Sequence, residues 1–156
     1  MDDIQIRLLS TGRDKLIETV SRELATGKGT RQHVLVSAPR GFGKSFFVRA
    51  VELTIEEFYP AAQVIILPEE QLNITTPSSF LHEILRALRG ESPSTVTGRF
   101  LDDPDGEWER SLQDLQDELD QLDKGTVVVV AIENFDDLVK NVFNDLSDES
   151  KLRTFL

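Results

Sequence analysis

Four residues of one short stretch, Gly41, Gly43, Lys44 and Ser45, have the types and spacing to hold a phosphate group. They belong to the P-loop pattern of a small residue, four others and then Gly-Lys-Ser, which starts here at Ala38 instead of the usual glycine. Glycines let a tight loop turn several backbone N–H groups inward, and the following helix dipole favours an anion. Lys44 would reach the β and γ phosphates, and the Ser45 hydroxyl would ligate Mg²⁺.

The sequence on either side of this stretch favours a phosphate cradle over a simple glycine turn. Residues 33–38 form an apolar run that predicts a buried strand, and residues 44–58 predict a helix that Pro60 closes. A strand, a glycine loop and a helix in this order are the context that the motif requires. The residues expected to bind the nucleotide are Pro39, Arg40, Gly41, Phe42, Gly43, Lys44, Ser45 and Phe46.

A carboxylate for the metal is expected at the end of a second apolar strand, residues 126–132. Glu133 stands there, followed by Asn134 where a proton-accepting Glu is usual, so hydrolysis should be slow unless Asp136 or Asp137 supplies the base. Alternatively, the two aspartates only form the first turn of a helix, where acids are favoured. The predicted catalytic residues are Lys44, Glu133, Asn134 and Asp136, and the predicted metal ligands are Ser45 and Glu133.

The remaining elements alternate between strands and helices, which predicts an α/β fold: a P-loop three-layer sandwich with a mostly parallel sheet. Thr76 is the expected N-cap of one helix, with Pro77 at its first position and Gly90 beyond its end. The other expected elements are a helical lead-in over residues 2–26 broken at 10–13, a glycine loop at 26–30, a strand at 63–68, a surface loop at 91–107 and an acidic helix from Trp108.

The acidic helix carries an apolar seam with steps of four and three, formed by Trp108, Leu112, Leu115, Leu119 and Leu122. Such a seam could pair with a partner helix as a coiled coil. It spans only about two heptads, fewer than a coiled coil needs, so we expect a helix that covers the sheet.

Composition excludes several classes of protein. With 156 residues and 39% hydrophobic content the chain can form one folded domain, and the absence of cysteine excludes disulfides and thiolate metal sites. An acidic N-terminus and no apolar run of about 18 residues predict a cytoplasmic protein without a membrane span. The net charge of −11 makes nucleic-acid binding through this segment unlikely, although Arg31 and Arg40 leave room for a local basic patch.

Residues 11–24, 33–51 and 127–139, in this order, resemble the AAA+ and STAND-type P-loop ATPases, in particular the branch of the origin-recognition ATPases. The resemblance implies that Gly12 and Arg13 belong to a motif that helps to enclose adenine; Arg13 could equally be a surface charge. It also implies five core strands, one of them between the P-loop strand and the carboxylate strand. Residues 1–156 would then be one truncated ATPase domain, with a lead-in at 1–30 and a core at 31–156.

Two functions follow from these expectations, with Mg²⁺ and ATP as cofactors. The first is an ATPase module whose slow hydrolysis drives a conformational change in a larger protein, with further domains after Leu156. A homo-oligomer is possible, in which an arginine of a neighbouring subunit completes the site. The second is a switch or scaffold that retains ATP or ADP, which Asn134 favours. A small-molecule kinase is a weaker third, because no Arg-rich lid is visible, and the lack of an Asn-Lys-x-Asp guanine reader favours adenine.

Overall fold

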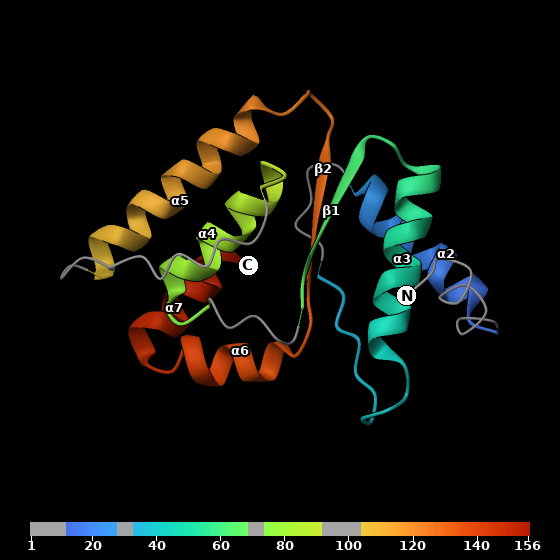
Figure 1. Cartoon of the computed structure of the whole chain (residues 1–156), viewed down its shortest axis with the longest axis horizontal. Helices are drawn as coiled ribbons and strands as arrows, with labels where there is room; N and C mark the ends of the chain where they lie inside the picture. The colour runs from blue at the N-terminus through green and yellow to red at the C-terminus, as the bar shows by residue number, and fades with distance from the viewer. Residues whose placement is uncertain (1–11, 28–32, 69–73, 92–103) are drawn as a thin grey trace. The chain divides into compact units, whose positions relative to one another are not determined.

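The computed structural model describes residues 12–27, 33–68, 74–91 and 104–156. Its elements are α2 (Asp14–Thr26), α3 (Lys44–Phe58), β1 (Ala62–Leu67), α4 (Pro77–Leu88), α5 (Pro104–Gln121), β2 (Val127–Ile132), α6 (Phe135–Val142) and α7 (Leu146–Phe155) (Figure 1). The chain divides into two compact units. The first consists of Met1–Val64 with Lys124–Ala131, and the second of Ile65–Asp123 with Ile132–Leu156.

Strands β1 and β2 are neighbours in a parallel sheet. The Val127 N–H donates to the Ala61 carbonyl at 3.0 Å, and the Glu133 N–H donates to the Leu67 carbonyl at 2.9 Å. Both bonds join residues with the same sequence offset, so the register is constant along the pair. The predicted α/β class with a parallel sheet is therefore confirmed, and both strands lie within one residue of their predicted bounds.

The first unit is built on the packing of α2 against α3, which lie side by side in Figure 1. One face of each helix is apolar, and the buried residues of the core are Ile17, Val20, Ala25, Phe47, Ala50, Val51, Ile55 and Val129. The Ser21 hydroxyl, fully buried, donates to the Val51 carbonyl at 3.4 Å. This core holds the helix that follows the glycine loop, and α3 has the bounds that the sequence predicts.

The predicted buried strand at residues 33–38 is wrong. Residues 33–39 have no regular secondary structure, and the described sheet contains only β1 and β2. Val34, Leu35 and Val36 are 44%, 83% and 38% exposed. β-Branched residues favour a strand only where a neighbouring strand supplies hydrogen bonds and side-chain contacts, and no described strand pairs with this segment.

In the second unit, α4 begins and ends at the predicted signals. Thr76 and Ser79 form a capping box: the Ser79 N–H donates to Thr76 Oγ1 at 3.1 Å, and the Thr76 N–H donates to Ser79 Oγ at 2.9 Å. Pro77 is the first helical residue, and Gly90 follows the helix with φ of +67°. These local interactions satisfy backbone groups that a helix end leaves without partners.

Helix α5 packs against α4, and an aromatic cluster brings together side chains of α4, α5 and α7 with Phe143, the residue that follows α6. The Phe80 ring meets Phe143 and Phe155 edge to face at centroid distances of 5.6 and 5.3 Å, and Trp108 meets Phe143 at 6.3 Å.

Two expectations from the sequence differ from the structure in this unit. Helix α5 begins at Pro104, so the predicted surface loop ends too late, and α7 was not predicted. Residues 92–103 of that loop, and 1–11 of the lead-in, lie outside the described residues.

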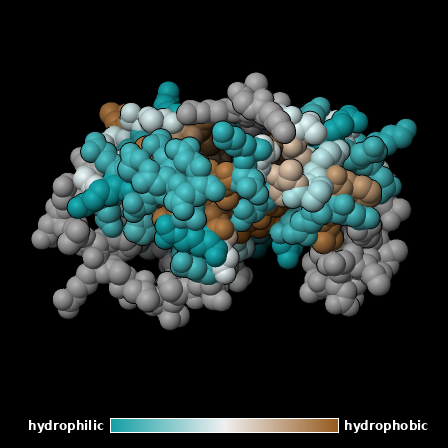
Figure 2. Space-filling model, turned by 90° about the horizontal axis from the view of Figure 1, so that it is seen from above, coloured by the Kyte–Doolittle hydropathy of each residue, from teal (hydrophilic) through white to brown (hydrophobic). Residues whose placement is uncertain are grey.

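The face shown in Figure 2 is mostly hydrophilic, with hydrophobic residues visible between the hydrophilic ones. None of the helices in the described ranges has the length and apolar character needed to cross a membrane.

Candidate phosphate-binding site

The glycine loop adopts a backbone that its two glycines make possible. The Phe42 N–H donates to the Pro39 carbonyl at 3.3 Å, which closes a turn with Gly41 at its third position. Gly41 has φ of +84°, the conformation that a type II turn requires there, and Gly43 has φ of +77° directly before α3. A side chain at either position would strain the backbone, so the sequence needs glycine at both.

The N-terminus of α3 follows the loop without a break. The Phe47 N–H donates to the Gly43 carbonyl at 3.0 Å, so the N–H groups of residues 44–46 precede the first intrahelical bond and can serve an anion. Lys44 and Ser45 are exposed, and Phe46 is half-buried. Lys44 Nζ donates to the Ala38 carbonyl at 2.7 Å and to the Pro39 carbonyl at 3.5 Å, which places the amine over the start of the loop.

Arg13 reaches the same loop from the start of α2. Its Nη2 donates to the Phe42 carbonyl at 2.9 Å, across 29 residues of sequence. A Cβ atom built on Gly43 would lie 3.4 Å from Arg13 Nη1, so the guanidinium lies close to the residue that precedes Lys44. The sequence left open whether Arg13 is a motif residue or a surface charge, and the structure brings it to the loop backbone.

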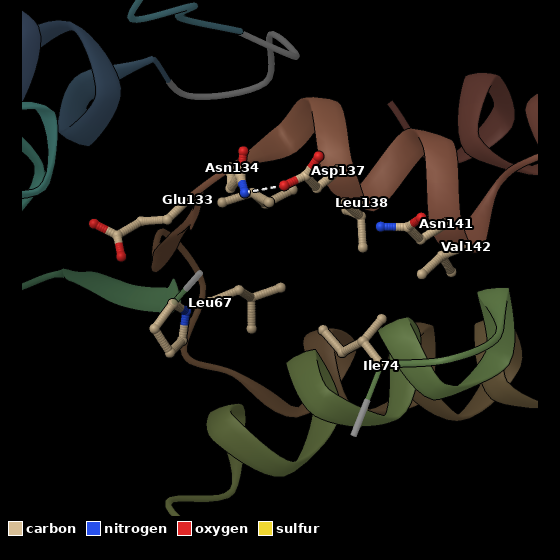
Figure 3. Close-up of a pocket in the computed structure, with 10 residues that line it drawn as sticks. Leu67, Ile74, Glu133, Asn134, Asp137, Leu138, Asn141 and Val142 are labelled. Carbon is tan, nitrogen blue, oxygen red and sulfur yellow. Dashed lines mark hydrogen bonds between the residues drawn. The ribbon is translucent and has the colours of Figure 1, made fainter. Parts of the chain in front are cut away.

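The predicted carboxylate site lies in the second unit, at the end of β2. Glu133 is half-buried, and in Figure 3 its carboxylate points away from the pair formed by Asn134 and Asp137. Asn134 Nδ2 donates to Asp137 Oδ2, and Asn134 has φ of 54°, in the left-handed region. Asp136 and Asp137 occupy the first turn of α6, the helical position that the alternative interpretation gave them.

A pocket of about 200 Å³ opens beside these residues (Figure 3). Its apolar lining includes Leu67, Ile74 and Val142, and its polar lining includes Asn134 and Asp137. All its lining residues belong to the second unit.

The structure thus groups the predicted site residues into two sets. Pro39 through Phe46 form the loop and the start of α3 in the first unit, whereas Glu133, Asn134 and Asp136 belong to the second. Within the described parts of the chain, no group of three or more His, Asp or Glu side chains is arranged to hold a metal ion. The residue of the loop that could serve a Mg²⁺ ion is Ser45, together with oxygens of the bound phosphates.

Comparison with known protein families identifies the family of the chain. The profile described as AAA domain matches residues 26–156, most of the chain and all of the loop. The chain belongs to the AAA domain family. No curated protein and no solved structure matches it significantly. The AAA assignment supports a nucleotide-binding P-loop module, in agreement with the loop geometry, and it does not distinguish the origin-recognition or STAND branch.

Proposed function

We propose that this AAA domain binds Mg-ATP through the loop from Pro39 to Phe46 and hydrolyses it slowly. The observation that carries the proposal is the loop itself, with left-handed Gly41 and Gly43, the α3 N-terminus behind them and the Lys44 amine over its start. The fit to a triphosphate rests on the exposed start of a 15-residue helix and on the Lys44 amine, whose hydrogen bonds to the Ala38 and Pro39 carbonyls phosphate oxygens can replace.

Each predicted residue has a distinct part in this proposal. Backbone N–H groups of the loop and the Lys44 amine bind the phosphates, and the Ser45 hydroxyl contributes to the Mg²⁺ shell. Glu133 acts on the metal through water. Bound Mg²⁺ supplies charge neutralisation for the transferred phosphoryl group. We also propose that the domain is coupled to further domains, that it forms a homo-oligomer and that it belongs to the origin-recognition branch. The sequence resemblance supports these three points.

Binding of a fluorescent ATP analogue, with and without Mg²⁺, tests the proposal. Lys44→Ala removes a charged donor to the phosphates and should weaken binding about 10- to 100-fold. Glu133→Gln should retain binding and lose part of its Mg²⁺ dependence. Equal binding by the wild type and both variants would contradict the assignment of the loop as the phosphate site.

A second candidate is a switch that retains nucleotide without turnover, and one contact favours it. The Asn134 amide donates to Asp137 in the first turn of α6, so the residue after Glu133 presents a hydrogen-bond donor where a proton acceptor is usual. An amide cannot accept a proton from the attacking water, which leaves hydrolysis dependent on another base.

A further inference from the structure

We propose that Arg13 is a positioning residue of the phosphate-binding loop, which orients the peptide unit between Phe42 and Gly43 for binding phosphate. This inference rests on the proposed function and deepens it. The sequence resemblance implies a different role for Arg13, in enclosing the adenine base. This inference assigns Arg13 to the phosphate-binding loop instead.

The first step of the argument is the geometry of one peptide plane. Arg13 Nη2 donates to the Phe42 carbonyl at 2.9 Å. A trans peptide is planar, and its carbonyl and N–H point in opposite directions; the described chain contains no cis peptide bond. A guanidinium that holds the Phe42 carbonyl therefore also sets the direction of the Gly43 N–H, which faces away from Arg13.

The second step is the freedom of the loop that Arg13 restrains. Gly41 and Gly43 flank Phe42, and glycine is the residue with the most backbone conformations available. The Phe42 side chain is 61% exposed, so its packing does little to hold the loop. A charged hydrogen bond from outside the loop is then an effective restraint, because it acts on the peptide between two flexible positions.

The third step is the rigidity of the element that carries Arg13. Its carbonyl accepts from the Leu16 and Ile17 N–H groups at 2.9 and 3.0 Å, which ties Arg13 to the first turn of α2. Ile17 is buried in the core against α3. The restraint on the loop is thus anchored in the same packed unit as the helix that follows the loop. A guanidinium also remains charged at every physiological pH.

The test measures binding of two ligands to the full chain by calorimetry, Mg-ATP and Mg-tripolyphosphate, which lacks a base. Arg13→Gln should weaken the binding of both ligands about 5- to 10-fold, the effect of losing one exposed hydrogen bond from a charged donor, with an unchanged melting temperature. Arg22→Gln is the matched control, because Arg22 is an exposed arginine on the same helix and its loss makes the same change in net charge. It should change either affinity less than twofold.

Several outcomes would overturn the inference. Loss of ATP affinity with normal tripolyphosphate affinity would assign Arg13 to the base, and equal losses in the Arg13 and Arg22 variants would show a general effect of charge. Wild-type affinity in Arg13→Gln would leave the hydrogen bond without a function. If this variant does not fold, Arg13→Lys replaces it: lysine keeps the charge but lacks the planar fork, so binding should still weaken, and wild-type affinity would again overturn the inference.

Failure of the proposed function is distinguishable by the Lys44→Ala variant in the same experiment. If the wild type binds neither ligand, or if Lys44→Ala binds both as well as the wild type, the loop is not a phosphate site and the assignment of Arg13 falls with it. If Lys44→Ala loses both ligands while Arg13→Gln keeps them, only the assignment of Arg13 is wrong.

Discussion

At the scale of single residues, the backbone conformation of Asn134 offers a reason for an asparagine at this position. Asn134 stands where an acid is usual for hydrolysis, yet its φ of 54° places it in the left-handed region just before α6. Asparagine tolerates that region better than most residues, and its side chain donates to Asp137. The position is therefore suited to connecting β2 with α6, whatever its effect on catalysis.

Substitution of Asn134 should separate these two contributions. Asn134→Ala should lower the free energy of unfolding by about 1 to 2 kcal/mol, because alanine is strained in the left-handed region. Asn134→Gly loses the same hydrogen bond without the strain and should cost less than half as much. Urea denaturation of both variants measures the difference, and equal losses would show that the Asp137 contact, not the backbone, sets the cost.

At the scale of elements, the apolar seam of α5 turns inward onto its own chain. Trp108 and Leu115 are buried, at 5% and 3% exposure, and Leu119 is 39% exposed. Helix α5 packs against α4, and between the two helices Arg89 Nε donates to Glu118 Oε2 at 2.8 Å, a contact that raises the pKa of Arg89. The seam therefore packs against a helix of its own chain. The expected cover of the sheet is replaced by packing on another helix.

Alanine substitutions along this seam should show whether its leucines pack in a core or form an oligomer contact. Leu115→Ala should lower the free energy of unfolding by about 2 to 4 kcal/mol, because it leaves a cavity beside α4. Leu119→Ala should cost less than about 1 kcal/mol and leave the sedimentation coefficient unchanged. A Leu119 variant that dissociates a larger species would instead identify the seam as a coiled-coil interface.

At the scale of the whole molecule, the proposed steps of the reaction belong to different units. The phosphate loop and Arg13 lie in the first unit, and Glu133 and Asn134 lie in the second. The proposed phosphate binding and the proposed hydrolysis can therefore be tested by separate substitutions, one in each unit. The two activities should respond differently to substitution.

Steady-state phosphate release measures this separation. Wild-type phosphate release should be slow but faster than that of Lys44→Ala, which should bind the nucleotide more weakly. Glu133→Gln should reduce release about 10- to 100-fold, as expected for a residue that acts on a metal through water, while it still binds nucleotide. If the wild type binds nucleotide but releases phosphate no faster than Lys44→Ala, the chain is a switch and not an ATPase.

The sequence by itself determined the features that depend on near neighbours in the chain. Signals within a few residues predict the bounds of α3, the N-cap Thr76, the two glycines of the loop and the two strands, and the structure agrees with each. The glycine pattern also predicted the turn of the loop, because positive φ at Gly41 and Gly43 is a local requirement.

Only the tertiary structure decided the features that depend on distant partners. The strand predicted at 33–38 failed because a strand needs hydrogen bonds from a neighbour, which the residues of the strand cannot supply themselves. The contact of Arg13 with the Phe42 carbonyl spans 29 residues, so no local pattern could show it. It arises because the buried residues of α2 and α3 pack into one core, which brings the two segments together.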